Sequence, residues 1–342
     1  METEHYDIHI CREDEYDKLV DFLDKHWIHN HVFVQSKELL DFQHFDKDRH
    51  LYNFVIAVNK ETKEVDAIQG FIPTYLYDAN LYDNGDFWSS IWKRRDDVDN
   101  GESGILGILV LSYVWELENF KTYGSIGLSV FAQNMYNALG LDCGVMDQYY
   151  IANPYFEQYQ LIRKPAINPL TCSDASVIRK ITIDEVTVKG CYRPIKTKTF
   201  FLNRYANHPF WHYDFYSVEN EGEQVAVFVT RIVNSNGSSC LRIVDVLGDL
   251  SKVGYIANGI VRILQEDNAE YVDFMNHGIA ESVFYKMGFL KVDLDSDEVI
   301  VPNYFEPYVE KNIKLHFGIK ADNTSDYVIF KADGDQDRPS RV

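Results

Sequence analysis

The amino-acid sequence predicts an α/β protein made of two similar halves, each a mixed sheet flanked by helices. Short apolar or alternating segments typical of strands are interspersed with segments whose apolar residues recur at helical spacing. The order of these segments in the first half returns in the second. The chain of 342 residues, of which 46% are hydrophobic, is long enough for two domains of ordinary size.

The first half is expected to begin with a strand, an amphipathic helix and a hairpin. One face of that helix carries apolar side chains at helical spacing, namely Tyr16, Leu19, Val20, Leu23 and Trp27. The turn-like residues 60–63 join the two strands of the hairpin. A polar loop containing glycine, residues 93–103, precedes an apolar helix. The expected strands of this half are 6–10, 53–59, 66–77, 87–92, 125–129 and 145–151, and the expected helices are 13–27, 104–118 and 131–139.

The second half repeats this order. Its expected strands are 211–218, 224–233, 241–247 and 271–275, and its expected helices are 255–265 and 280–287. The clearest repeat is local, because residues 135–141 and 284–289 both form the end of a helix that carries a tyrosine, closes on glycine and leads into an apolar strand. We therefore expect a first lobe over 1–160, a basic linker with prolines over 161–204, and a second lobe with a tail over 205–342.

The charge of the chain argues against nucleic acids and anionic membranes as partners. The 33 Lys and Arg residues face 53 Asp and Glu residues, which gives a formal charge of −20, whereas both of these partners require a broad basic face. The acidic residues concentrate in residues 1–160, with 28 against 12 basic ones, while residues 161–204 hold nine basic and three acidic ones. This basic segment is either a site for an anionic ligand or a solvated loop.

The sequence is expected to belong to a cytoplasmic protein. It begins with no basic segment followed by an apolar core, as a signal peptide would, and its longest apolar stretch, 105–115, is far shorter than the roughly 20 residues of a membrane span. The five cysteines are odd in number, widely separated and without a C-x-x-C pair, which favours reduced thiols over a disulfide framework or a zinc cluster.

The element order, with its glycine loop before a helix and a helix that ends Tyr-x-x-x-Gly, resembles the GNAT superfamily of acyltransferases, twice in tandem across nearly the whole chain. The segments 86–93, 125–127 and 149–151, and the tail segments 303–307 and 331–339, are similar to double-lobed members that act in surface-polysaccharide biosynthesis, such as that of O-antigen and lipopolysaccharide. The resemblance implies transfer of an acyl group, acetyl or 3-hydroxybutanoyl, from coenzyme A to the amine of a dTDP-linked amino-dideoxy sugar such as dTDP-3-amino-3,6-dideoxygalactose. Acyl-CoA is then a co-substrate, and no metal is required.

The glycine loop is the expected coenzyme site, because backbone N–H groups at a helix N-terminus suit a pyrophosphate. The loop departs from the family's [RQ]-x-x-G-x-[GA] pattern, since its basic or amide residue is missing and its second small residue is displaced by one. The alternative is a simple turn beside a solvated basic run. The equivalent segment 248–254 is acidic and poor in glycine, which places the coenzyme in the first lobe. The expected coenzyme-binding residues are Trp92, Lys93, Arg94, Arg95, Gly101, Gly104 and Gly107.

Three residues are candidates for proton transfer. The resemblance implies that Tyr136 is the acid for the departing thiolate, and a phenol suits this role because it is neutral at pH 7; its alternative is core packing. His208, beside Pro209, is a possible base. Asp245, in the centre of an apolar strand, is either a buried carboxylate with a raised pKa or half of a structural ion pair, with Arg242 as partner.

The acceptor is expected between the lobes and held largely by the second one. Aromatic planes beside hydrogen-bonding groups suit a thymine or a sugar face, although core packing accounts equally well for the aromatic residues. Arginines are suited to grip a diphosphate. The expected acceptor-binding residues are Arg204, Tyr205, Trp211, Asn276, His277, Tyr304 and Arg338.

Other sites and functions are weaker. The histidines at 26, 29 and 31 lack the further ligands of a zinc signature, and residues 333–337 lack the glycine and the glutamate of a calcium loop. An aminoacyl or peptidoglycan-type transferase with two lobes is an alternative, but an aminoacyl-tRNA donor would demand a basic face. A binding protein that senses acyl-CoA or a nucleotide sugar without turnover is another alternative.

Overall fold

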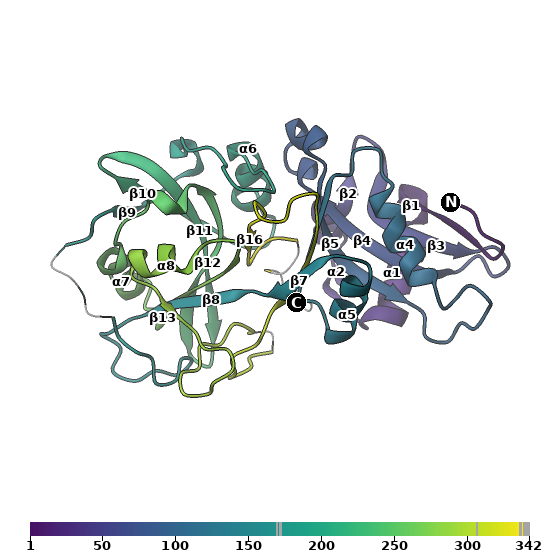
Figure 1. Cartoon of the computed structure of the whole chain (residues 1–342). Coiled ribbons are helices and arrows are strands. Elements are labelled where there is room, and N and C mark those ends of the chain that lie inside the picture. Colours follow the sequence, from purple (N-terminus) through teal and green to yellow (C-terminus); the bar gives the residue numbers. More distant parts are fainter. Residues whose placement is uncertain (169, 171–172, 306, 335–336, 338–342) are drawn as a thin grey trace.

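A computed structural model of the chain describes residues 1–168, 170, 173–305, 307–334 and 337. Two lobes lie side by side, each around one sheet (Figure 1). The helices are α1 Tyr16–Phe22, α2 Val32–Gln35, α3 Lys37–His44, α4 Leu106–Trp115, α5 Val130–Ala138, α6 Lys198–Phe201, α7 Ala257–Glu266 and α8 Glu281–Met287. The helix predicted over 13–27 is continued beyond α1 by a π-helical turn, Leu23–Trp27.

The first sheet contains the strands of the first half and one strand from the end of the chain. Its order is β1-β3-β4-β5-β6-β15-β7, and β2 pairs with β3 at the edge. These strands are β1 Tyr6–Arg12, β2 Phe45–Asp46, β3 Leu51–Asn59, β4 Val65–Pro73, β5 Asp86–Arg94, β6 Thr122–Ile126, β7 Asp142–Val145 and β15 His316–Lys320. All neighbours are antiparallel except β5 and β6.

The second sheet mirrors the first. Its order is β14-β8-β13-β12-β11-β10-β9, and β16 pairs with β13. These strands are β8 Asp147–Ala152, β9 Val177–Ile181, β10 Asp214–Asn220, β11 Glu223–Ser235, β12 Ser238–Gly248, β13 Tyr271–His277, β14 Leu290–Lys291 and β16 Ile329–Phe330. Again one pair of neighbours is parallel, here β12 and β13. The predicted repetition of one α/β unit is confirmed.

The two lobes exchange strands. The single strand predicted over 145–151 is two strands, of which β7 closes the first sheet and β8 enters the second sheet between β13 and β14. In return, β15 crosses from the end of the chain into the first sheet between β6 and β7. Each sheet is therefore completed by a strand from the other half, and the expected boundary at residue 160 does not coincide with the division between the sheets.

The expected linker is partly built into the second lobe. Strand β9 pairs with β10 at the edge of the second sheet, and α6 packs its phenylalanines into the core between the lobes. That core joins apolar side chains of the first sheet, such as Trp88 and Ile126, to those of the second, such as Val229 and Val244. Because burial of apolar surface drives packing, this shared core holds the lobes against each other.

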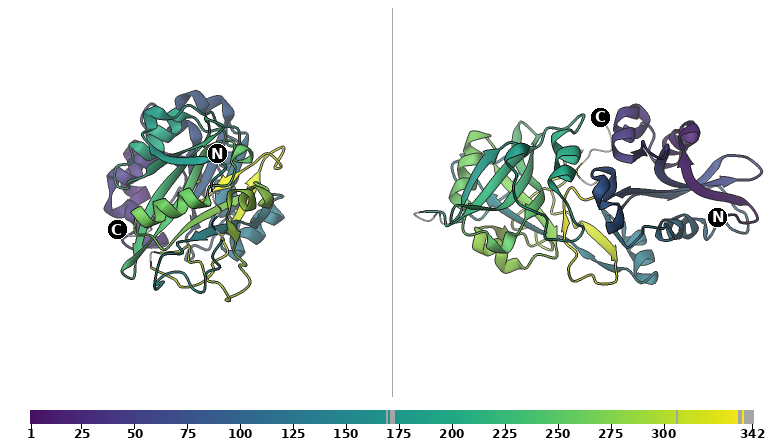
Figure 2. Two further views of the ribbon diagram at one scale, coloured as in Figure 1. Left: turned by 90° about the vertical axis from the view of Figure 1, so that its left-hand side faces the viewer. Right: turned by 90° about the horizontal axis from the view of Figure 1, so that it is seen from above.

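Helices cover the remaining faces of both sheets. In the first lobe, α4 and Tyr136 of α5 pack on one face, while α1, α2 and α3 pack on the other. In the second lobe, α7 and α8 cover the face away from the first lobe. Figure 2 shows the C-terminal segment, in yellow, between the two lobes.

Candidate functional site

Both sheets split at their parallel pair of strands. Strands β5 and β6 are paired only at the three positions Asp86, Phe87 and Trp88. Beyond Trp88, β5 continues to Arg94 along β4 alone, whereas the rest of β6 pairs with β15. An edge of β5 from Ser89 onward is thus left without a strand partner among the described residues. The first split opens toward the loop that leads into α4.

A β-bulge marks this split. Gln69 of β4 lies opposite Trp92 and Phe71 lies opposite Ser89, so that Gly70 alone faces the two residues Ser90 and Ile91 of β5. A bulge bends its strand and redirects its backbone groups. Gly70 is required for this close approach, because a Cβ there would lie 2.2 Å from Ser90 Oγ. The bulge lies directly beyond Trp88, the last residue of β5 that pairs with β6.

Tyr136 of α5 lies fully buried beside this split. Its ring packs 5.5 Å from that of Trp92, and its hydroxyl is 3.4 Å from the hydroxyl of Tyr123 on β6. Burial raises the pKa of Tyr136, although its hydrogen bonds to Tyr123, Ser89 and Ser125 lower it in part. The phenol therefore stays protonated at neutral pH, as an acid must.

A glycine on the exchanged strand makes room for Tyr136. A Cβ on Gly318 of β15 would lie 2.6 Å from the Tyr136 ring. The position of Tyr136 thus depends on a residue almost two hundred positions along the chain.

The loop before α4 leaves its helix end open. No side chain caps this end at Ile105, and a Cβ on Gly101 or Gly104 would meet no other atom within 4 Å. The Trp92 side chain ties β5 to the helix, since its Nε1 donates to the Gly107 carbonyl at 2.9 Å. The N–H groups of Ile105 and Leu106 donate to the carbonyls of Glu102 and Ser103, at 3.1 and 3.4 Å. The feature of this helix end that suits an anion is therefore chiefly its partial positive charge.

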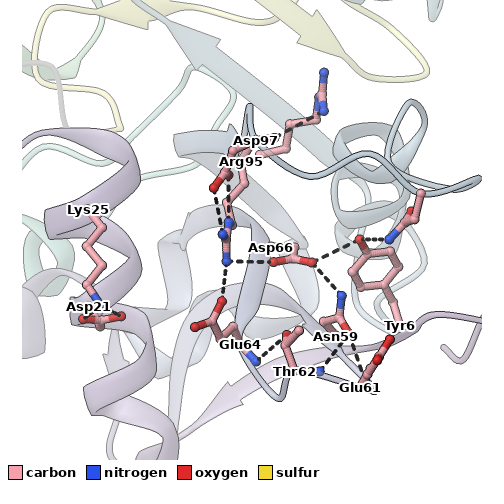
Figure 3. Close-up of polar contacts among 12 residues, drawn as sticks. Tyr6, Asp21, Lys25, Asn59, Glu61, Thr62, Glu64, Asp66, Arg95 and Asp97 are labelled. Atoms are coloured by element: carbon pink, nitrogen blue, oxygen red, sulfur yellow. Dashed lines mark hydrogen bonds and ion pairs between the residues drawn. The ribbon is translucent and has the colours of Figure 1, made fainter.

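The basic residues expected at the coenzyme phosphates are partly engaged elsewhere. Arg95 contacts three carboxylates, with Glu64 at 2.6 Å, Asp66 at 3.3 Å and Asp97 at 2.9 Å (Figure 3). Lys93 pairs with Asp96 at 2.6 Å. Arg94 donates to the Arg95 carbonyl, and within the described part of the chain no carboxylate lies within ion-pair distance of it.

Glu102 anchors the glycine loop to the start of the chain. Its carboxylate accepts hydrogen bonds from the Thr3 hydroxyl and from the backbone N–H groups of Glu4 and His5. Asn100 donates to the Tyr6 hydroxyl at 2.7 Å. The loop is thus anchored by its polar side chains, and its glycines face open space.

The second split is filled by the chain itself. Strand β16 pairs with β13 at Asn276 and His277, and the Ala332 N–H donates to the Val244 carbonyl at 2.9 Å. Val244 is the extra residue of a bulge in β12 that matches the one in β5. The C-terminal segment therefore lies between β12 and β13, where the first lobe has an open edge.

Asp245 helps to lock this segment. Lys196 lies 2.6 Å from both Asp245 and Asp333, and Tyr205 donates to Asp245 at 2.5 Å. All of these side chains are buried. The expected alternative partner of Asp245, Arg242, instead forms a bidentate pair with Asp273, at 3.0 and 2.9 Å. The surroundings of Asp245 thus favour a structural ion pair.

His208 is also held by its surroundings. Its Nδ1 accepts the backbone N–H groups of Phe210 and Trp211, and its ring lies 4.7 Å from that of Phe42. Burial, and then Arg204, lower the pKa of His208 to about 3. A ring with so low a pKa is a weak proton acceptor at neutral pH, so these contacts favour a structural role.

The expected acceptor residues fall into separate places. Arg204 and Tyr205 are buried between the lobes, and Trp211 lines a hollow of about 420 Å³ beside them. Asn276 and His277 lie where β13 meets β16. Tyr304 is exposed on the loop whose next residue, Phe305, lies 5.4 Å from the Arg242 guanidinium, and Arg338 lies outside the described residues.

Sequence reasoning missed the polar residues behind Tyr136 and the lysine behind Asp245. Tyr123 and Ser89 sit on predicted strands, but their chemistry depends on the split between those strands. The one available signal for Lys196 was the excess of basic residues over 161–204.

Comparison with known proteins identifies the fold. No family model matches the chain, and no curated protein does, but 154 chains among the solved structures match. A GCN5-related N-acetyltransferase from Anabaena variabilis has a TM-score of 0.54 and 9% identity, over 93% of this chain and 73% of that one. A conserved protein of unknown function from Enterococcus faecalis, described as a probable N-acyltransferase, has a TM-score of 0.50 and 8% identity, over 91% and 71%. The predicted two-lobed GNAT-like fold is confirmed.

Two further findings concern membranes and metals. None of the helices in the described ranges has the length and apolar character needed to span a bilayer. In the same ranges, no three or more His, Cys, Asp or Glu side chains are gathered as they would be around a metal ion.

Proposed function

We propose that this chain is an acyl-CoA-dependent N-acyltransferase whose first lobe holds the acyl-CoA at the split between β5 and β6. The observation that carries the proposal is the contrast between the two splits. Among the described residues, the first has a strand edge without a partner strand, a bulge and a helix without a side-chain cap, whereas the second is occupied by β16 and Ala332. The likeness in fold to a GCN5-related N-acetyltransferase and to a probable N-acyltransferase supports the same class of activity.

The reaction joins the acceptor nitrogen to the acyl carbon and breaks the carbon–sulfur bond of the thioester. The amine loses a proton and the departing thiolate gains one. In this proposal, Tyr136 donates the proton to the sulfur, and a main-chain N–H of β5 near Trp92 stabilises the oxyanion of the tetrahedral intermediate. The phenol suits its role because burial keeps it neutral, and the bulge suits the other because it turns backbone groups outward.

Arg94, Gly101, Gly104 and Gly107 are the residues of the expected coenzyme set that best fit the phosphates. The loop glycines leave room for a pyrophosphate over the N-terminus of α4, and Arg94 has no carboxylate partner among the described residues. Lys93 and Arg95 remain candidates only if the coenzyme displaces their carboxylates.

The proposed acceptor is the amine of a dTDP-linked amino-dideoxy sugar, and the proposed acyl group is acetyl or 3-hydroxybutanoyl. This finer assignment is supported by the sequence resemblance to enzymes of surface-polysaccharide synthesis. In this proposal the acceptor lies between the lobes, near Arg204, Tyr205 and Trp211, and the donor and acceptor react directly in a ternary complex.

A coenzyme-release assay tests the proposal. The protein is mixed with pairs drawn from a panel of acyl-CoA thioesters and dTDP-linked or UDP-linked amino sugars, and free thiol is detected with a thiol reagent. We expect thiol release only when donor and acceptor are both present, and a product mass raised by the acyl group. An absence of release across the panel would refute the transferase assignment, and calorimetric binding of acyl-CoA without release would favour a binding protein instead.

A further inference from the structure

A second feature of the fold is a cluster of buried cations on the second sheet, here called the cationic cluster: Arg204, Arg231, Arg242 and Lys331. Each of these side chains is wholly or largely buried. They come from the segment after α6, from β11, from β12 and from the segment after β16. Of these four, only Arg204 was expected from the sequence to bind a ligand.

Two aspartates face these four cations. Arg242 pairs with Asp273, and Arg231 pairs with Asp337 at 3.2 Å and also donates to its backbone carbonyl at 2.9 Å. Asp337 is the centre of the cluster. Tyr213 donates to its carboxylate at 2.8 Å. Burial raises the pKa of Asp337, but the charges of Arg231, Arg242 and Lys331 outweigh burial and lower it.

Arg204 and Lys331 are left without a carboxylate in ion-pair distance among the described residues. The Arg204 guanidinium lies over the rings of Tyr77 and Tyr205, at 5.6 and 5.2 Å, and its charge interacts with Asp337. Lys331 is 6% exposed, and burial lowers its pKa to about 7. An uncompensated buried charge is costly. Among the described residues, the cluster therefore holds up to two positive charges more than its two aspartates when Lys331 is protonated.

A hollow lies at one member of the cluster. Arg231 lines a cavity of about 420 Å³ between the segment before β10 and strand β11, with Phe210 and Trp211 as its aromatic wall. Asp214 also lines it, and its carboxylate is paired with Lys180 at 2.7 Å. Aromatic rings beside an arginine suit a ligand that combines a flat ring with a phosphate.

The cluster is within reach of the proposed acyl site. Gly334 lies against β5, since a Cβ there would be 3.3 Å from the Ser89 carbonyl oxygen. Asp337, at Arg231, follows three residues later, and three residues of extended chain span at most about 10 Å. A molecule the size of a nucleotide sugar can therefore touch both places.

We infer that the cationic cluster binds a phosphoryl group of the acyl acceptor, entering past Arg231 from the hollow. The identification of the ligand as the acyl acceptor rests on the proposed function. The binding of a tetrahedral dianion at the cluster does not depend on acyl transfer. The two negative charges of a dianion match the excess positive charge of the cluster with Lys331 protonated, whereas a carboxylate supplies only one.

Sulfate is the probe, because it is a tetrahedral dianion whose charge is constant from pH 6 to 9. Calorimetric titration at low ionic strength is expected to give saturable binding at one site. Lys331→Met should weaken it about tenfold or more. Lys252→Met is the matched control, since Lys252 is an exposed lysine on the same lobe, and it should leave the affinity unchanged.

The pH dependence identifies the group that binds. Lys331 is faced by Arg242 on β12, Arg231 on β11, Asp273 on β13 and Asp337 of the tail. Burial lowers the pKa of Lys331 to about 7, so its charge changes between pH 6 and 8.5. Sulfate affinity of the unmodified protein should therefore fall severalfold between pH 6 and 8.5, and that of Lys331→Met should not.

The outcomes separate this inference from the proposed function. Sulfate binding that requires Lys331 supports the site even if no acyl transfer is found. An absence of saturable binding, equal affinity in Lys331→Met, or acetate binding as tightly as sulfate overturns the inference, even if coenzyme A is released in the panel assay.

Discussion

Tyr136 has two properties that suit a proton donor: burial keeps its phenol protonated at neutral pH, and it lies beside the edge where the thioester is proposed to lie. Its hydroxyl is buried, 3.4 Å from the hydroxyl of Tyr123, and it also hydrogen-bonds Ser89, the first residue of the edge of β5 that leaves β6. This arrangement resembles a preorganised proton donor more than a packing residue, because packing alone does not call for hydroxyls on both rings.

Replacing Tyr136 with phenylalanine tests this role. Tyr136→Phe keeps the ring in its place against Gly318 and removes only the hydroxyl, so we expect turnover to fall by about 10² or more while the affinity for acyl-CoA stays within about twofold. Tyr285→Phe is the control, because Tyr285 occupies the equivalent helix of the second lobe and is half exposed. A turnover number unchanged by Tyr136→Phe removes Tyr136 from the mechanism.

His208 makes a prediction about acid stability. Its folded-state pKa of about 3 lies below the ordinary value of 6.5, so between these values the unfolded chain binds more protons and stability falls as the pH falls. This one group is expected to lower the free energy of unfolding by up to about 2 kcal/mol between pH 7 and pH 5.

The substitution His208→Asn keeps an acceptor for the backbone N–H groups and removes the titration. Chemical denaturation at both pH values should therefore show a smaller acid loss for His208→Asn than for the unmodified protein. His212→Asn, at an exposed position, should behave like the unmodified protein. Identical acid losses in all three would contradict the buried, neutral ring.

At the scale of elements, the segment from β16 to Asp333 lies in the second split, between β12 and β13. The main-chain bonds of β16 hold one side of it, and the ion pairs of Lys196 with Asp245 and Asp333 hold the other. Burial and the neighbouring Asp245 raise the pKa of Asp333, so this buried triad depends on its single lysine.

Removing that lysine should destabilise the packing of this segment in the second split. Lys196→Met leaves two carboxylates buried without a cation, and we expect a loss of about 3–5 kcal/mol in the free energy of unfolding. Lys198→Met, two residues along and exposed, should change it by less than about 0.5 kcal/mol. A Lys196→Met protein as stable as the unmodified one would show that the triad does not hold the segment.

Local patterns in the sequence were enough to predict most of the long elements. The hairpin of β3 and β4 carries its own turn, and α7 and α8 carry their own apolar faces, so these elements needed no distant partner. The helix α3 was missed, although Ser36 caps it as an ordinary N-cap residue does. The short strands β14 and β16 were missed because their pairing, not their composition, makes them strands.

At the scale of the molecule, the exchange of β8 and β15 makes the two lobes interdependent. No local pattern predicts such an exchange, because the sheet that a strand joins is decided by distant partners. The repeat was readable from the sequence, but the boundary between its copies was not. The same holds for the site, since Tyr136 and the glycine loop were predicted by resemblance, whereas the open and filled splits exist only in the folded chain.

At this scale, the formal charge of −20 is unevenly distributed between the two lobes. The acidic first lobe neutralises several of its own cations, as around Arg95, while the second lobe buries an excess of positive charge around Asp337. The anionic ends of donor and acceptor are therefore expected at different places, with the donor at the open helix end of the first lobe and the acceptor at the cationic cluster.

Hydrogen exchange of the backbone, measured with and without an acyl-CoA, tests the central claim most directly. The account predicts slower exchange on binding in residues 89–107, which cover the free edge of β5, the glycine loop and the start of α4. It predicts no change in residues 241–254, the equivalent segment of the second lobe. Slower exchange confined to residues 241–254, or no slower exchange in residues 89–107 at saturating acyl-CoA, would contradict it.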